Sequence, residues 1–85
     1  MKKYKLTEET IIVNGRTLYR IEALRDFGDV KKGNKGGFVE KENNLSQYGD
    51  SWVDDDATVF GNAQVCGNAR IYGNATIYDN AKICD

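Results

Sequence analysis

The C-terminal half of the chain is built from a six-residue repeat, and this repeat restricts the possible folds more than any other feature. Six consecutive hexapeptides run from Tyr48 to Ile83. Each has Asn or Asp at its third position, a small residue at its fourth and a β-branched aliphatic residue at its last. The closing residues are Val53, Val59, Val65, Ile71, Ile77 and Ile83. A period this short is typical of the hexapeptide class of solenoid and excludes helix-pair repeats and propeller blades.

Elementary rules predict one short strand and one turn for each hexapeptide. Side chains alternate across a strand, so the aliphatic residue points inward and its neighbours point outward. The Gly-Asn or Asp-Asn pairs make the corners, because Gly and Asn tolerate positive φ. Three hexapeptides form one triangular coil. Residues 18 positions apart are therefore expected to stack on adjacent rungs, about 4.8 Å apart.

The repeat resembles the left-handed parallel β-helix of hexapeptide-repeat proteins. The segment from Gly36 to Ala63, GGFVEKENNLSQYGDSWVDDDATVFGNA, is similar to a bacterial and prophage subgroup often labelled acyltransferases. The repeat and the resemblance together predict an all-β fold, a parallel left-handed β-helix of about two to three coils, and the N-terminal segment adds a β-hairpin cap. The left hand comes from the resemblance alone, because parallel crossovers are otherwise nearly always right-handed.

The N-terminal segment predicts a β-hairpin. Asn14-Gly15 is a strong type I′ turn signal, and it lies between the β-rich runs TIIV and RTLYRI. A two-residue loop places Ile11 opposite Leu18 and Glu9 opposite Arg20. A lone hairpin is barely stable, so one of its faces is expected to dock on the first coil and cap it. That face carries Leu6, Ile12, Tyr19 and Ile21.

We expect one compact domain with three segments. Residues 1–27 form the hairpin cap, residues 28–47 a loop and a degenerate first coil, and residues 48–85 the hexapeptide β-helix. In the degenerate coil, Leu45 falls in the slot of the small residue. The Gly- and Lys-rich loop before it is interpreted as a set of turns, with an anion-binding nest of backbone N–H groups as the alternative.

The chain contains no His. The resemblance implies that a His would act as general base in an acyltransferase, and that three His would bind the metal in the carbonic-anhydrase branch of the fold. Neither chemistry can be carried over, so we expect no catalytic residue, no cofactor and no metal. The run Asp54-Asp55-Asp56 raises a hard-cation hypothesis. A solvated corner is favoured, because adjacent residues point in different directions.

Charge and cysteine content restrict location and partners. Twelve basic and thirteen acidic residues give a net charge of −1, which indicates no nucleic-acid partner and no membrane partner. No apolar run resembles a signal peptide or a membrane span, so a cytoplasmic protein is expected. Cys66 and Cys84 are 18 residues apart, so a disulfide is conceivable. Free thiols are nevertheless expected in a chain without an export signal.

The outward-facing positions suggest an interface. Phe60 is expected to lie beneath Tyr78 as an exposed aromatic column, and contiguous apolar surface often marks a contact site. The alternative is that aromatic residues simply favour strands and stack along the coil. The interface candidates are Trp52, Thr58, Phe60, Tyr72, Thr76 and Tyr78.

The sequence therefore favours a non-catalytic structural or protein-interaction module that associates with itself through its outer faces, and the resemblance implies phage or prophage origin. The resemblance implies a trimer as the favoured homo-oligomer, and a different protein partner is the alternative. Two other functions stay open. One is an acyltransferase-like protein that binds acyl-CoA between subunits, and the other is a phage inhibitor of a host defence system.

Overall fold

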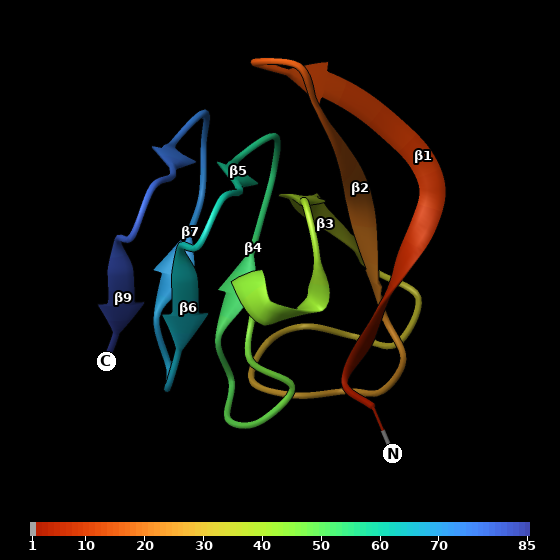
Figure 1. Cartoon of the computed structure of the whole chain (residues 1–85). Coiled ribbons are helices and arrows are strands. Elements are labelled where there is room, and N and C mark those ends of the chain that lie inside the picture. The colour runs from red at the N-terminus through yellow and green to blue at the C-terminus, as the bar shows by residue number, and fades with distance from the viewer. Residues whose placement is uncertain (1) are drawn as a thin grey trace.

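The computed structural model describes residues 2–85, and its regular structure is strand apart from one short 3₁₀ helix (Figure 1). The strands are β1 Tyr4–Val13, β2 Arg16–Ala23, β3 Lys35–Val39, β4 Trp52–Val53, β5 Thr58–Val59, β6 Gln64–Cys66, β7 Arg70–Ile71, β8 Thr76–Ile77 and β9 Lys82–Cys84, and the 3₁₀ helix η1 is Glu42–Asn44. Met1, the first residue of the predicted cap, lies outside the described residues. Within residues 2–85 no helix is long and apolar enough to cross a membrane.

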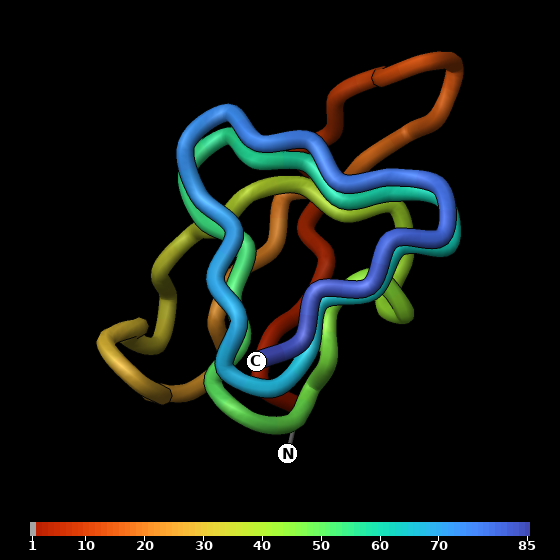
Figure 2. Tube along the Cα trace, turned by 90° about the vertical axis from the view of Figure 1, so that its left-hand side faces the viewer, coloured from red at the N-terminus to blue at the C-terminus, as the bar shows by residue number. Residues whose placement is uncertain are grey.

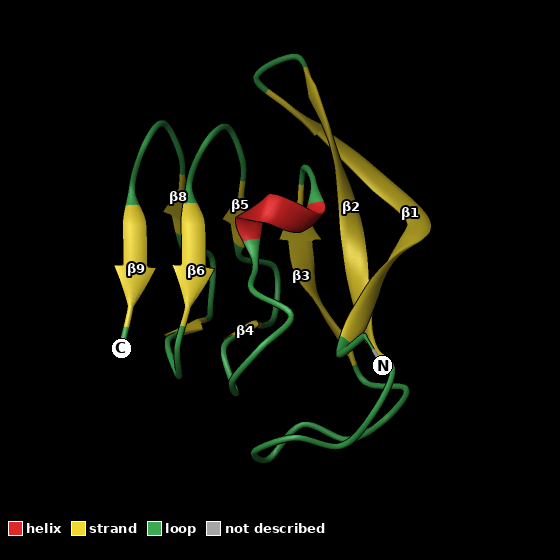
Figure 3. Cartoon of the chain, turned by 60° about the horizontal axis from the view of Figure 1, so that its bottom comes forward, coloured by secondary structure: helices red, strands yellow, loops and turns green. Residues whose placement is uncertain are grey.

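The hexapeptide region forms two stacked rungs of three short strands. We call β4, β5 and β6 the first rung and β7, β8 and β9 the second rung. Each strand of the first rung pairs in parallel with the strand three places later, and the partners are 18 residues apart, as in Val59 and Ile77. Figure 2 shows the two rungs lying over one another with a triangular outline, and Figure 3 shows their separate strands. The stacking predicted from the repeat is confirmed.

The aliphatic residues that close the first hexapeptides fill the interior of this triangle. Val53, Val59 and Val65 are fully buried, and Ile71 is nearly so. Ala57 lies among them in the same core cluster and is also fully buried. The inward direction predicted for these residues is therefore confirmed.

The layer before the first rung has a different register from the predicted one. Val39 pairs with Val59, and Leu45 forms a bridge with Val65, so the offset is 20 residues. Leu45 consequently extends the aliphatic column and does not occupy the slot of the small residue. The two additional residues lie after Leu45, because Leu45 and Val53 are eight residues apart, whereas their partners Val65 and Ile71 are six apart.

Two adjacent glycines allow β3 to approach the first rung closely. A Cβ on Gly36 would clash with the carbonyl oxygen of Val53, and a Cβ on Gly37 would clash with that of Ala57. Only a residue without a side chain fits at such a close backbone approach. The C-terminal end of the predicted Gly-rich loop is thus part of the strand β3.

The hairpin is present with the predicted turn. Asn14 and Gly15 have φ values of 51° and 76°, as a type I′ turn requires. Near the turn the register is the predicted one, with Ile11 opposite Leu18. The register then shifts between Leu6 and Thr10, so that the predicted pairing is wrong toward the base of the hairpin.

The face of the hairpin that packs on the rest of the molecule also differs from the prediction. Ile21 is fully buried in the main core, as expected, but Ile12 is 68% exposed. Leu18, on the opposite face of the strand, is fully buried against Phe38 and Phe60. The register shifts in both strand pairs explain this, because a bulge increases the local twist and redirects the side chains beyond it.

The hairpin and the solenoid share one sheet. Its strand order is β1-β2-β3-β5-β8, so β3 pairs antiparallel with the hairpin on one side and parallel with the first rung on the other. The hairpin is therefore joined to the solenoid by backbone hydrogen bonds as well as by side-chain packing.

The two isoleucines of the hairpin give a direct test of this packing. Ile21→Ala should lower the free energy of unfolding by about 2–5 kcal/mol, because it leaves a cavity in the core. Ile12→Ala, at an exposed position, should change it by less than about 0.5 kcal/mol. Urea denaturation of both variants measures the difference. Equal effects would show that the hairpin packs through a different face.

A buried lysine fixes the start of β1. The Nζ of Lys3 donates hydrogen bonds to the carbonyl oxygen and the Oγ of Ser51 at 2.7 and 3.2 Å, and it lies 4.9 Å from the centre of the Phe27 ring. Burial, and then the nearby charge of Arg25, lowers the pKa of Lys3 to about 8. The folded protein thus holds this proton less tightly than the unfolded chain does.

The lowered pKa of Lys3 predicts a pH dependence. Between pH 8 and 10 the unfolded chain binds more protons than the folded one, so the free energy of unfolding should rise with pH. The raised pKa of Tyr4 acts in the opposite direction, but only above about pH 10. Lys3→Met should remove the rise, whereas Lys5→Met, at an exposed position, should keep it. Urea denaturation across this pH range measures the slope, and a flat wild-type profile would contradict the account.

Candidate interaction surface

Three of the six interface candidates are covered by other parts of the chain. Trp52 points outward from the first rung, but it is almost fully buried beneath the loop that follows β2. Its ring meets those of Phe27 and Tyr4 edge to face, with centroid distances of 5.2 and 6.4 Å. Val30 adds a further apolar side chain to this cluster. The expectation that Trp52 is exposed is therefore wrong, because the loop folds back over it.

Phe60 and Thr58 are covered by the hairpin side of the sheet. Phe60 is buried with Leu18 and Phe38, and Thr58, which pairs with Phe38 on β3, is also buried. The predicted aromatic column is present, since the rings of Phe60 and Tyr78 stack with centroids 5.8 Å apart and planes 15° apart. Phe60, the first-rung member of this column, is nevertheless buried and not available to a partner.

The three exposed candidates all belong to the second rung. Tyr72 is 68% exposed and Tyr78 is 52% exposed, and Thr76 is also exposed. Thr76 pairs with the buried Thr58, and Tyr78 stacks on the buried Phe60, so the cover of the first-rung residues does not extend over their second-rung partners. The interface role stays a prediction, and the surface on which it depends is reduced to these three residues.

A polar groove lies beside Tyr78. It has a volume of about 650 Å³ and separates the hairpin turn from the corners that follow β5 and β8. Asn14 and Arg16 line it from the hairpin side, and Asn62 and Asn80 line it from the corners. The groove offers amide and guanidinium groups, the phenol of Tyr78 and the carboxylate of Asp79.

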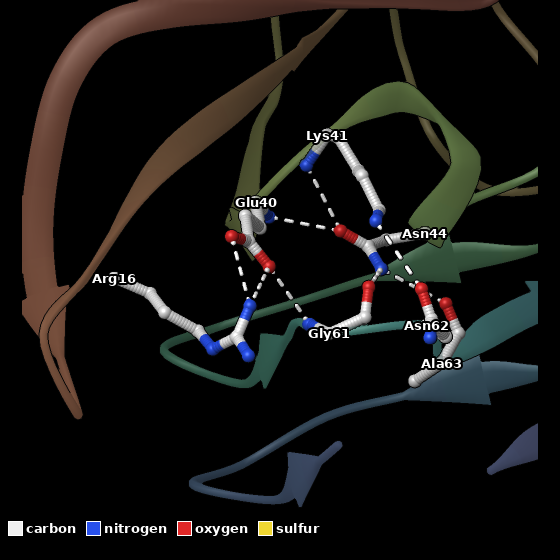
Figure 4. A network of polar contacts seen from close by, with 7 residues as sticks. All are labelled: Arg16, Glu40, Lys41, Asn44, Gly61, Asn62 and Ala63. Carbon is white, nitrogen blue, oxygen red and sulfur yellow. Dashed lines mark hydrogen bonds and ion pairs between the residues drawn. The ribbon is translucent and has the colours of Figure 1, made fainter. Parts of the chain in front are cut away.

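A carboxylate ties the hairpin to the corner below this groove (Figure 4). Glu40 accepts two hydrogen bonds from the guanidinium of Arg16, at 3.0 and 3.1 Å, and one from the backbone N–H of Gly61, at 2.8 Å. The Gly61 N–H, aided by Arg16, holds the pKa of Glu40 below its usual range. The positive charge of Arg16, which lines the groove, is thus neutralised by the carboxylate of Glu40.

Asn44 is the buried centre of the same network. Its Oδ1 accepts hydrogen bonds from the N–H groups of Glu40 and Lys41, at 3.0 and 2.9 Å. Its Nδ2 donates to the carbonyl oxygens of Gly61 and Ala63, at 3.3 and 2.9 Å. All four hydrogen-bonding positions of the amide are used. Asn44 therefore acts as a structural bridge between η1 and the first rung.

The acidic run on the first corner is engaged in protein contacts. Asp54 accepts a hydrogen bond from Arg70 at 3.2 Å, Asp55 accepts one from the N–H of Gly73 at 2.9 Å, and Asp56 lies 3.5 Å from Arg20. Each side chain has a different partner, in agreement with the expected divergence of adjacent residues. Across residues 2–85 there is no cluster of three or more His, Cys, Asp or Glu able to hold a metal ion.

Arg70 links the loop that covers Trp52 to the first and second rungs. Its guanidinium donates to Asp29 in that loop as well as to Asp54. The hydrogen bond and the charge of Arg70 hold the pKa of Asp29 below its usual range. Within the loop, Asp26 accepts from the N–H of Lys32 at 2.8 Å, so its own side chains supply the turn contacts.

Cys66 and Cys84 are joined by a disulfide. They are direct partners on β6 and β9, with Cα atoms 4.5 Å apart, which is within the range that a disulfide spans. The expectation of free thiols is therefore wrong. The bond links the last strand of the second rung to the rung beneath it.

Sequence analysis did not identify Lys3, Phe27, Val30 or Asn44 as structural residues. The burial of Phe27 and Val30 could have been predicted, because they are the apolar residues of an otherwise polar loop. Nothing in the pattern around Lys3 or Asn44 separates them from exposed residues of the same type. Their burial depends on contacts with distant parts of the chain.

The stacked parallel strands of the hexapeptide region are those of a β-solenoid protein built from sequence repeats. A family model described as the YdcK beta solenoid repeat matches residues 63–75 and 69–85. The chain is also 36% identical over 70 residues to a protein of Escherichia coli (strain K12) named uncharacterized acetyltransferase YdcK. These matches confirm the resemblance to hexapeptide-repeat, acyltransferase-like β-solenoid proteins.

The extent of this similarity differs between the two chains. The matched region covers 72% of this chain but 22% of the Escherichia coli protein. The chain thus spans about a fifth of the length of the relative it matches. The word acetyltransferase belongs to the name of that relative, and what it implies for this chain is treated below as a proposal.

The buried amide provides a test of the network under the groove. Asn44→Ala should lower the free energy of unfolding by about 1–3 kcal/mol, because it leaves buried backbone groups without partners. Asn43→Ala is the matched control, since Asn43 is the exposed neighbour in the same 3₁₀ helix. Chemical denaturation measures both. An Asn44 variant as stable as the Asn43 variant would show that the network contributes nothing to folding.

Proposed function

We propose that the chain is a non-catalytic β-solenoid module that associates with itself through the outer face of its second rung. The observation that carries this proposal is the exposure of Tyr72 and Tyr78 on that rung, whereas the aromatic residues of the first rung are covered by the chain itself. Exposed aromatic side chains next to an apolar core are typical of contact sites, because they bury a large area at low entropic cost.

The proposal includes the finer features of the fold. The solenoid would be a left-handed coil of two to three turns, with residues 1–27 as its hairpin cap. A homotrimer is the favoured assembly, by analogy with hexapeptide-repeat proteins, and a different protein partner is the alternative. The cytoplasmic location and the inhibition of a host defence system stay predictions from the sequence.

An acyltransferase-like function is the second candidate, and the name of the Escherichia coli relative favours it. Such a protein would bind acyl-CoA between subunits. The absence of His from the chain opposes this candidate, because the base would have to be Asp or Glu. Isothermal titration with acetyl-CoA separates the two. Saturable micromolar binding would favour the acyltransferase, and no heat of binding would favour the interaction module.

The tyrosines of the second rung generate a prediction about assembly. Tyr72→Ser combined with Tyr78→Ser should weaken self-association about tenfold or more, because truncation of an aromatic contact residue typically costs more than 1 kcal/mol. Tyr48→Ser is the control, since Tyr48 is also exposed but lies outside the second rung. Sedimentation velocity over a range of concentrations measures the masses. A wild-type protein that stays monomeric throughout would refute the proposed function.

A further inference from the structure

Within residues 2–85, Arg25 is the one arginine whose guanidinium has no carboxylate partner. Its side chain is half-buried, and its polar contact is a hydrogen bond of 3.5 Å to the carbonyl oxygen of Asp26. The other three arginines are paired with acidic residues: Arg16 with Glu40, Arg20 with Glu9 and Asp56, and Arg70 with Asp29 and Asp54. The charge of Arg25 is therefore not neutralised within the described part of the chain.

Arg25 lies close to the buried Lys3. The guanidinium carbon of Arg25 and the Nζ of Lys3 lie 5.6 and 4.9 Å from the centre of the same ring, that of Phe27. The positive charge of Arg25 lowers the pKa of Lys3, and this effect is larger than the opposing effect of Asp50. The two cations thus repel each other more than the nearby carboxylate compensates. An anion placed near Arg25 would stabilise both of them.

A pocket of about 390 Å³ opens beside Arg25. Its lining residues are Lys2, Arg25, Gln47 and Tyr48. All four side chains carry N–H or O–H donors, and none is a carboxylate. Gln47 is fixed in place, because its Oε1 accepts hydrogen bonds from the N–H groups of Lys3 and Tyr4, at 2.8 and 3.3 Å. The pocket thus presents donors to a ligand that carries acceptors.

The carboxylates around this pocket leave the charge of Arg25 free. Glu42 is paired with Lys2, with 2.6 Å between the Oε1 and the Nζ. Asp26, the neighbour of Arg25 in sequence, accepts a hydrogen bond from the N–H of Lys32 at 2.8 Å. A negatively charged ligand at Arg25 would therefore displace no ion pair of that residue.

Backbone groups of the loop after β2 are not the source of this anion site. The N–H groups of Phe27 and Val30 donate to each other's carbonyl oxygens, at 2.9 and 2.8 Å. Those of Lys31 and Lys32 donate to side chains of the same loop. These N–H groups form turns and are not free for a nest. Anion binding in this part of the chain depends on the side chain of Arg25.

We propose that the pocket lined by Lys2, Arg25, Gln47 and Tyr48 binds a phosphate group, and that Arg25 is the residue that holds it. A guanidinium presents parallel N–H donors that match two oxygens of a phosphate. Lys2 adds a positive charge, and the amide and the phenol can donate to the remaining oxygens. A phosphate has more acceptor oxygens for these four side chains than a carboxylate has.

A second pocket favours a phosphate monoester over free phosphate. It has a volume of about 370 Å³ and shares Gln47 and Tyr48 with the first pocket. Leu45 and Cys66 are among its other lining residues, so its surface is both apolar and polar. A ligand with its phosphate at Arg25 would extend across Tyr48 and place its organic group in this second pocket.

Isothermal titration at constant ionic strength tests the site with phenyl phosphate, inorganic phosphate and benzoate. Phenyl phosphate should bind most tightly, and benzoate, which has the same ring but a carboxylate, should bind about tenfold more weakly. Arg25→Gln should weaken the binding of phenyl phosphate about tenfold or more, because hydrogen bonds to a charged group are lost. Lys32→Gln is the matched control, since it removes the same charge from an exposed position of the same loop outside the pocket.

The titration of Lys3 provides a second measurement that needs no variant. A bound anion favours the charged amine, so it should raise the pKa of Lys3 above its value of about 8. Sulfate is the probe, because it is tetrahedral like phosphate and its charge stays constant over this pH range. Carbon-13 NMR of the Lys3 Cε gives the pKa in sulfate and in sodium chloride of equal ionic strength. The rise in the free energy of unfolding between pH 8 and 10 should become smaller in sulfate.

The outcomes are independent of the proposed self-association, since Tyr72 and Tyr78 line neither pocket. Circular dichroism shows whether Arg25→Gln is folded, and the Lys3 titration decides if it is not. No saturable binding of either phosphate compound, equal binding by a folded Arg25→Gln protein, or a Lys3 pKa that sulfate leaves unchanged would overturn the site. Benzoate that binds as tightly as phenyl phosphate would overturn the assignment of phosphate. Equal affinity for phenyl phosphate and inorganic phosphate would support the site and overturn the ester.

Discussion

The parallel hydrogen-bond ladder between the two rungs is the constraint on which the rest of the structure depends. It holds residues 18 positions apart in register on three sides at once, and so places each valine of the first rung under an isoleucine of the second. The ladder forms only if each corner turns within a few residues. Gly61 and Gly67 meet this need with φ values of 68° and 67°, and Asp55 does so with 54°.

The N-terminal part of the chain completes this core from one end and one side. The hairpin joins the sheet through β3 and places Leu18 over Phe60, while the loop after β2 covers Trp52 with Phe27. The outer aromatic residues of the first rung are thereby used within the molecule. Tyr72 and Tyr78 of the second rung are exposed, which concentrates the candidate contact surface on that rung.

The repeat was sufficient to predict the inward aliphatic residues, the 18-residue stacking and the hairpin turn, because each depends on local periodicity and turn chemistry. The register of Leu45 was not predictable, because the hexapeptide pattern gives no signal of the two residues inserted between Leu45 and Val53. The exposure of Trp52 and Phe60 was mispredicted for a related reason. Their burial is decided by how a loop and a bulged hairpin fold back, which local patterns do not encode.

The most direct test of the central claim is the set of methyl–methyl nuclear Overhauser effects in a methyl-labelled sample. The stacked-rung account predicts strong cross-peaks between Val59 and Ile77 and between Val65 and Ile83, which are partners on adjacent rungs. Absence of both cross-peaks in the folded protein would contradict the account.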